Sequence, residues 1–168
     1  NVGLAGCTED EYRLHFSLWA LLGSPLMIGC DIRSMDETTA SILTNKAVLA
    51  INQDPDYNQP FEINIHTATL PQHDQEQQLS SGEIPIYAKL LSNGDYAIGI
   101  FNLSDTPTNR WSAVIMADRL GLPETSGMTL ELTDVWTGEK TVMTNGIYSA
   151  SVAPHACKLM RARVIPKP

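Results

Sequence analysis

The sequence of 168 residues has few cysteines, no long apolar run and no block of like charge. Its three cysteines are scattered and form no Cys-x-x-Cys pair, so a disulfide framework is not expected. No apolar run approaches the ~20 residues that cross a bilayer, so no membrane partner is expected. The net charge of −8 argues against a nucleic-acid partner. Glycine-rich phosphate loops and the G-x-S-x-G motif are also absent from the sequence.

The first third of the chain predicts helices. A Thr-x-x-Glu capping box begins at Thr8 and precedes a segment that is apolar on most faces, which is typical of a helix buried between other elements. A second box, Ser-x-x-Glu from Ser34, predicts a helix over 35–43. A shorter helix is expected from Asn45 until the chain reaches Pro55.

Between the first two helices lies a short apolar segment, Leu26–Cys30. Its residues do not alternate with polar ones, which predicts a strand buried on both faces, as in a parallel sheet. Such a strand needs neighbours on both edges, and no other segment resembles a parallel partner. Residues 1–56 are therefore interpreted as the end of a larger, incomplete α/β domain.

Residues 57–168 predict an antiparallel β-sandwich. A polar stretch at 66–83, rich in Gln, Ser and His, is expected to form a long loop. Asn93-Gly94 is a strong hairpin signal between two apolar runs. About seven short strands separated by Gly, Asn and Pro turns are typical of this fold class. The expected strands are 84–91, 96–102, 111–117, 128–136, 140–144, 148–152 and 156–164.

Two groups of acidic residues are candidates for chemistry. Asp31 and Arg33 follow the predicted strand, where α/β barrels place active-site residues. Asp31 is either a catalytic or substrate-facing carboxylate, or it forms with Arg33 a structural ion pair or helix-capping group, and the structural role is favoured. Asp54 and Asp56 are close enough in sequence for glycosidic hydrolysis, but their place beside Pro55 favours a turn.

The histidines predict no metal site and no cofactor. His66 and His73 lack an evident third ligand, and zinc sites usually have three or four. His15 lies in an apolar helix, which favours a buried, hydrogen-bonded side chain, and His155 follows a proline at a turn.

The cysteines and aromatic residues favour packing roles. Cys7, Cys30 and Cys157 lie in or beside apolar segments, which is typical of free buried thiols. The rings of Trp111, Trp136 and Tyr148 either form a sugar-stacking face or pack within the domain, and packing is favoured.

Several ordered motifs resemble glycoside hydrolase family 27, the family of α-galactosidases and α-N-acetylgalactosaminidases. The family patterns H-F-x-L-W-A, P-L-x-I-G-x-D-x-R, I-L-x-N and V-I-A-x-N-Q-D-P have counterparts in that order. The C-terminal half matches more loosely, with D-x-W-[ST]-G and V-x-x-H. The corresponding segments are 15–20, 25–33, 42–45, 48–55, 134–138 and 152–155.

The resemblance implies a (β/α)8 barrel followed by an antiparallel sandwich. It makes 8–23 the seventh barrel helix, 26–30 the eighth strand and 35–52 the last helical segment. The family's aspartate nucleophile, its acid/base aspartate and its D-P-D-M motif lie earlier than any segment matched here. No catalytic residue is therefore transferred. Cys30, Asp31 and Arg33 inherit only a place near the active-site end of that strand.

The sequence therefore predicts the C-terminal portion of a retaining α-galactosidase-like enzyme that acts on terminal α-linked galactose. By itself this chain is expected to be inactive, with the missing barrel portion as its partner in the same or a separate chain. The alternative is a non-catalytic carbohydrate-binding or interaction module. Acidic composition and the habit of many family members favour secretion, in which case the Asn102-Leu103-Ser104 sequon matters.

Overall fold

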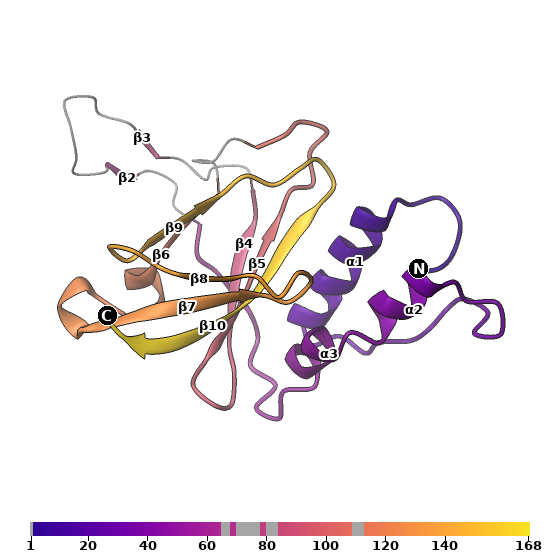
Figure 1. Ribbon diagram of the computed structural model, residues 1–168, viewed down its shortest axis with the longest axis horizontal. Helices are drawn as coiled ribbons and strands as arrows, with labels where there is room; N and C mark the ends of the chain where they lie inside the picture. The colour runs from indigo at the N-terminus through magenta and orange to yellow at the C-terminus, as the bar shows by residue number, and fades with distance from the viewer. Residues whose placement is uncertain (1, 65–67, 70–77, 80–83, 109–112) are drawn as a thin grey trace.

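The computed structural model describes residues 2–64, 68–69, 78–79, 84–108 and 113–168. Three helices come first and lie together at one side of the molecule, and the strands form the other side (Figure 1). The helices are α1 (Glu9–Leu21), α2 (Glu37–Leu43) and α3 (Lys46–Asn52).

Each helix begins at a side chain that binds its free backbone N–H groups. The capping box predicted at Thr8 is confirmed, because Thr8 accepts from the Glu11 backbone while Glu11 accepts from the Thr8 backbone. Asn45 caps α3 as expected. The box predicted at Ser34 is wrong, since Asp36 caps α2 by accepting from Thr39 N at 2.7 Å. A carboxylate is the stronger acceptor for these N–H groups.

The described strands form one large antiparallel sheet and two small pairs. The large sheet has the order β1-β4-β5-β10-β7-β8, and β6 pairs with β9 while β2 pairs with β3. Two 3-10 turns, η1 (Ala117–Leu120) and η2 (Glu124–Ser126), join β6 to β7. The strands are β1 (Phe61–Glu62), β2 (Ala68–Thr69), β3 (Gln78–Leu79), β4 (Ile86–Leu90), β5 (Tyr96–Phe101), β6 (Ala113–Met116), β7 (Met128–Asp134), β8 (Lys140–Val142), β9 (Ile147–Ala150) and β10 (Cys157–Pro166).

The predicted hairpin is confirmed, with Ile86 opposite Ile100 and a turn in which Gly94 has a positive φ of 84°. The loop expected at 66–83 contains the two-residue strands β2 and β3, and its other residues lie outside the described part of the chain. The expected class, an antiparallel sandwich after the end of a barrel, agrees with this arrangement.

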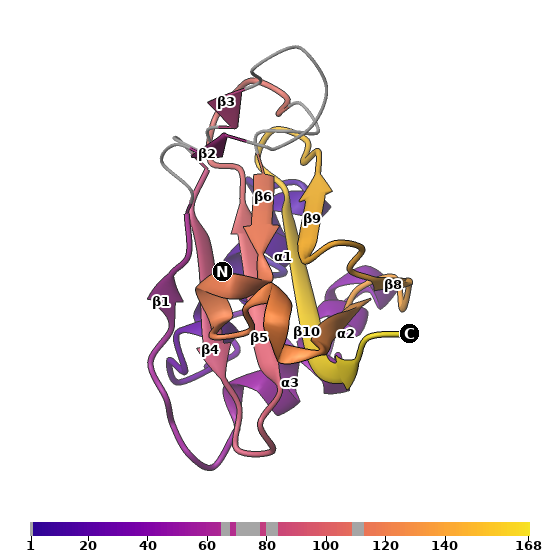
Figure 2. The same ribbon diagram turned by 90° about the vertical axis from the view of Figure 1, so that its left-hand side faces the viewer.

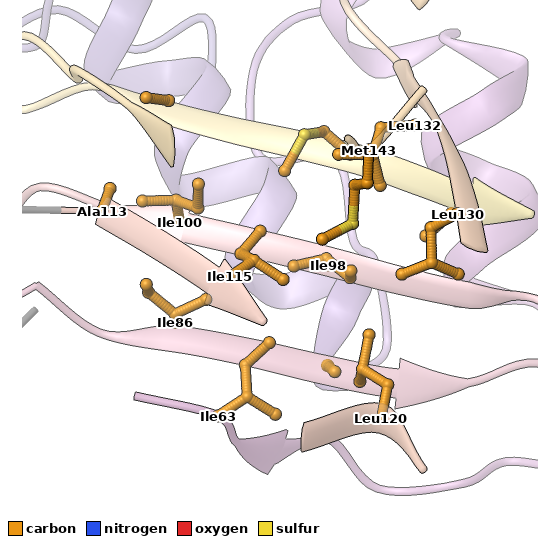
Figure 3. Close-up of a cluster of buried hydrophobic side chains, with 14 of the residues drawn as sticks. Ile63, Ile86, Ile98, Ile100, Ala113, Ile115, Leu120, Leu130, Leu132 and Met143 are labelled. Carbon is orange, nitrogen blue, oxygen red and sulfur yellow. The ribbon is translucent and has the colours of Figure 1, made fainter. Parts of the chain in front are cut away.

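The large sheet is covered on both faces. Figure 2 shows β6, β9 and η1 on one face and the helices on the other. Between the sheet and the β6–β9 pair lies an aliphatic core, in which Ile98, Ile100, Ile115 and Leu130 are fully buried (Figure 3). A second core lies between the sheet and the helices. It contains Phe16, Ala20, Leu21, Ile42, Val48, Ile51, Ala97, Phe101 and Leu159.

Among the described residues, four hydrogen bonds join the helices to the sheet side of the molecule, one of them from Cys157 Sγ in β10 to Ser17 Oγ in α1 at 3.4 Å. The Trp136 indole Nε1 donates to Ser17 Oγ in α1 at 3.0 Å, and Asn45 Nδ2 donates to the Val135 carbonyl at 3.2 Å. Lys89, a fully buried lysine of β4, donates from Nζ to the Ile51 carbonyl at 3.1 Å. These contacts satisfy polar groups that burial would otherwise leave without partners.

The sequon asparagine is part of the folded interior. Asn102 is 1% exposed, and its amide nitrogen donates to the carbonyls of Thr106, Val152 and Ala153 at 3.0–3.1 Å. Its amide oxygen accepts from the backbone and hydroxyl of Ser104. In the folded chain this nitrogen is not accessible for glycosylation. Among the described residues, no helix is both long and apolar enough to cross a membrane.

The Asn102 network predicts a stability defect. Replacing Asn102→Ala removes the hydrogen bonds that this buried amide makes to three carbonyls and to Ser104, which should lower the free energy of unfolding by about 2 kcal/mol. Urea unfolding followed by tryptophan fluorescence measures the change. Leu103→Ala is the matched control, because that side chain is 59% exposed. Equal stability of the two variants would contradict the assigned role.

Candidate functional site

The segment that follows α1 is extended but is not a strand. The predicted buried strand Leu26–Cys30 is wrong for the chain as described, because no described strand pairs with it and Met27 is 91% exposed. The physical reason is the missing parallel partner that the sequence already indicated for this segment. A parallel strand is held by hydrogen bonds to neighbours, and no described segment supplies them.

Asp31 and Arg33 lie in the turn after this segment and bind each other. Asp31 Oδ1 accepts from Arg33 Nε at 2.9 Å and from its backbone N at 3.0 Å, and Oδ2 accepts from Nη2 at 2.7 Å. The hydrogen bonds from Arg33 hold the pKa of Asp31 below its usual range, and those to Asp31 raise the pKa of Arg33. The Arg33 side chain is 86% exposed, so the outer side of this ion pair faces solvent.

Cys30 anchors the start of this turn against the N-terminal residues. It is half-buried and free, and its Sγ lies so near Gly3 that a Cβ there would be 2.9 Å away. Gly3 also has a positive φ of 84°, so glycine suits the position for two reasons. The Asp31–Arg33 pair that follows Cys30 faces solvent.

An apolar hollow of about 380 Å³ lies between α1, the extended segment and the two short helices. His15 is half-buried at its edge, with its ring 5.6 Å from that of Trp19, and burial lowers the His15 pKa. Trp19 is 42% and Ile28 55% exposed. The expectation that this helix is buried on most faces is therefore met only on the side that contacts the sheet. The hollow is also lined by Phe16, Leu26, Leu43 and Leu49.

Asp54 and Asp56 do not form a pair of facing carboxylates. Asp54 is 7% exposed and accepts from the backbone and hydroxyl of Ser92 and from the Asp56 backbone. Burial alone would raise the Asp54 pKa, but these hydrogen bonds and the charge of Lys89 outweigh it, so the pKa lies below its usual value. Asp54 therefore has the turn role that its position beside Pro55 favoured.

The remaining candidate residues lie away from the apolar hollow, and some lie outside the described part of the chain. Trp136 packs on α1, with the Arg13 guanidinium 5.6 Å from its ring centre, so packing rather than an open stacking face is observed. His155 stands in the predicted turn and contacts Asp105 at 2.8 Å. Burial raises the pKa of Cys157 to about 11, as expected of an inert thiol, whereas Cys7 is exposed. His66, His73 and Trp111 lie outside the described residues.

Sequence reasoning missed the buried Lys89. Burial lowers its pKa, while the charge of Asp54 acts in the opposite direction. Strand alternation before the Asn93-Gly94 turn places Lys89 on the same face as Tyr87 and Leu91. This pattern could have indicated that Lys89 is buried. Within the described residues, no cluster of His, Cys, Asp and Glu has the composition of a metal site.

Two family models match the chain in sequence order. Residues 1–54 match alpha galactosidase A, and residues 81–162 match the alpha galactosidase C-terminal beta sandwich domain. The chain is 34% identical over 161 residues to an alpha-galactosidase of Cyamopsis tetragonoloba and 37% identical over 161 residues to one of Oryza sativa subsp. japonica. The matches cover 94% of this chain but 34% and 33% of those proteins. The chain thus spans about a third of the length of these curated relatives.

The architecture is similar to that of solved enzymes. Alpha-galactosidase I from Mortierella vinacea superposes with a TM-score of 0.76 over 96% of this chain and 37% of that one. At 23% identity this likeness shows the fold alone.

The hydrogen bonds to Asp54 predict a contribution to the free energy of unfolding that depends on pH. Its folded pKa is lowered, so its contribution is present above the unfolded value of 3.8 and is lost as the pH falls through the folded pKa. Ser92→Ala removes one hydrogen bond to the carboxylate and should cost about 1 kcal/mol near neutral pH.

Urea unfolding at a series of pH values tests this expectation. The difference between Ser92→Ala and the unmodified chain should stay constant down to about pH 5 and shrink below that. Ser151→Ala is the control, because this exposed side chain forms no hydrogen bond to a described residue. If the difference in unfolding free energy stays the same down to the lowest pH at which the chain is folded, the assigned role of Asp54 is wrong.

Proposed function

Because the chain belongs to the α-galactosidase family, glycoside hydrolase family 27, we propose that it is the C-terminal portion of a retaining enzyme that removes terminal α-linked galactose. The observation that carries this proposal is the ordered match of two family models to residues 1–54 and 81–162. Identities of 34% and 37% over 94% of the chain to named alpha-galactosidases support it.

A retaining glycosidase needs two carboxyl groups about 5 Å apart, one of them with a raised pKa so that it can donate a proton. Among the described carboxyl groups with a shifted pKa, namely those of Glu11, Asp31, Asp36 and Asp54, every shift is downward. Each of these groups is held ionised by hydrogen bonds, which suits an acceptor and not an acid. We therefore propose that this chain alone does not hydrolyse galactosides.

The rest of the catalytic barrel is the proposed partner. The face formed by α1 and the extended segment carries exposed apolar side chains, among them Trp19, Leu22, Met27 and Ile28. An apolar surface of this kind is unusual in a free monomer and marks an interface. A neighbouring strand pairing with 26–30 would supply the missing backbone hydrogen bonds and bury Met27.

In that arrangement Asp31 and Arg33 lie at the carboxyl end of a barrel strand, where substrate is bound in barrels of this type. We propose that the pair contacts the sugar or orders the neighbouring loops. The free side of the Asp31 carboxylate can accept a hydroxyl hydrogen, and Arg33 holds it ionised.

The first test is an assay of turnover with 4-nitrophenyl α-galactoside. We expect no hydrolysis by the 168-residue chain and clear hydrolysis by a longer natural form that contains the upstream barrel. Turnover by the short chain itself would overturn the proposed division of roles, and inactivity of both forms would overturn the proposed activity.

A second test addresses Asp31 in the longer form. Asp31→Asn should lower kcat/KM for the same galactoside by about tenfold, the loss expected when a charged hydrogen bond to a ligand is weakened. Thermal stability should not change, because exposed ion pairs contribute little to it. Glu37→Gln, an exposed carboxylate nearby in α2, is the matched control. Unchanged kcat/KM in Asp31→Asn would leave the pair with a structural role only.

A further inference from the structure

A second, polar pocket lies on the opposite face of the large sheet. It has a volume of about 170 Å³ and is bordered by β7, β8, β9 and β10. Met160 contributes to its lining beside Asp134, Tyr148 and Lys158, and Glu139 and Thr141 complete the polar wall.

Strand alternation separates this pocket from the helices. Lys158 lies on the same face of β10 as Met160, whereas Leu159 between them packs against the helices. Asp134 likewise follows Leu132 on the sandwich face of β7. The pocket therefore remains open to solvent when the apolar face of α1 is covered.

Several groups in the pocket have unfilled hydrogen-bonding capacity. The Lys158 ammonium lies 3.6 Å from Asp134 Oδ2, beyond hydrogen-bond reach, and it donates to no described residue. The Tyr148 phenol is half-buried, and no hydrogen bond joins it to a described residue. Burial raises the pKa of Tyr148, so its hydroxyl remains a donor at neutral pH.

The acceptors are fixed in place. Asp134 Oδ1 accepts from the backbones of Trp136 at 2.9 Å and Thr137 at 3.1 Å, which leaves Oδ2 toward Lys158. Glu139 is exposed at the rim, and its carboxylate forms no ion pair with any described residue. The pocket thus presents donors and acceptors side by side around an aromatic ring.

Charge and size restrict the ligand. Two carboxylates and one ammonium carry a net negative charge, which disfavours an anion, and the ammonium disfavours a metal cation. A neutral molecule with many hydroxyl groups uses both the donors and the acceptors. The volume is below the roughly 300 Å³ of common drug-sized sites, which favours one sugar ring over an oligosaccharide.

We propose that the pocket formed by Asp134, Glu139, Tyr148 and Lys158 is a non-catalytic binding site for a single neutral sugar ring. This assignment does not depend on the proposed hydrolysis. It gives the sandwich a binding role on the face away from the helices.

The test uses the longest natural form of the protein, labelled with ¹³C at its methionine methyl groups. Met160 lines the pocket, and Met128, at the opposite end of β7, serves as the internal control. Titration with galactose, glucose or inositol should shift the Met160 signal with a Kd of about 1–10 mM, as expected for a few hydrogen bonds to a small ligand. A Met160 signal that does not move with any of the three, or that moves only with inorganic phosphate, would overturn the proposal.

Variants then locate the interaction. Lys158→Met and Tyr148→Phe should each weaken sugar binding about tenfold. Lys46→Met, on the helix face, should leave binding unchanged. If Lys158→Met does not fold, Tyr148→Phe and the exposed Glu139→Gln test the proposal instead. Unchanged sugar binding in both variants would overturn it. Turnover of the aryl galactoside should be normal in all of these variants, so this result is separable from the hydrolysis assay.

Discussion

The close approach of helix α1 to the large sheet is the constraint on which the rest of the arrangement depends. It occurs at Gly99 in the middle of β5, where an added Cβ would lie 2.5 Å from the Phe101 ring and 2.9 Å from the Leu21 side chain. Both neighbours are buried and cannot move away easily. Because nothing projects from the sheet at this point, Leu21 reaches it and α1 carries α2 and α3 into the same layer.

The docked helices give the domain two different surfaces. The inner side of α1 is bound to the sheet by packing and by Trp136, and its outer side leaves an apolar hollow. The proposed barrel portion would lie on that outer side and cover the hollow.

The turn after β7 shows how one residue serves several purposes. Asp134 accepts two backbone N–H groups, and Gly138 with a positive φ of 75° closes the turn by donating to the Asp134 carbonyl. Trp136 is thereby directed to the helix face, while the other oxygen of Asp134 faces the polar pocket. The D-x-W-T-G sequence is therefore explained by geometry, since each named residue has a separate contact.

The sequence alone determined the elements whose signals are local. The Thr8 capping box and the Asn93-Gly94 hairpin depend on contacts within a few residues. The succession of short strands is indicated by the turn residues between them, and the family motifs are also present in the sequence. Tertiary structure decided what depends on distant partners. Leu26–Cys30 has the composition of a strand but no described neighbour, and Asn102 has the pattern of a sequon but is buried by residues about fifty positions away. The same reason hid the Lys89 contact with α3 and the pocket around Lys158, because hydrogen bonds between distant segments leave no local pattern.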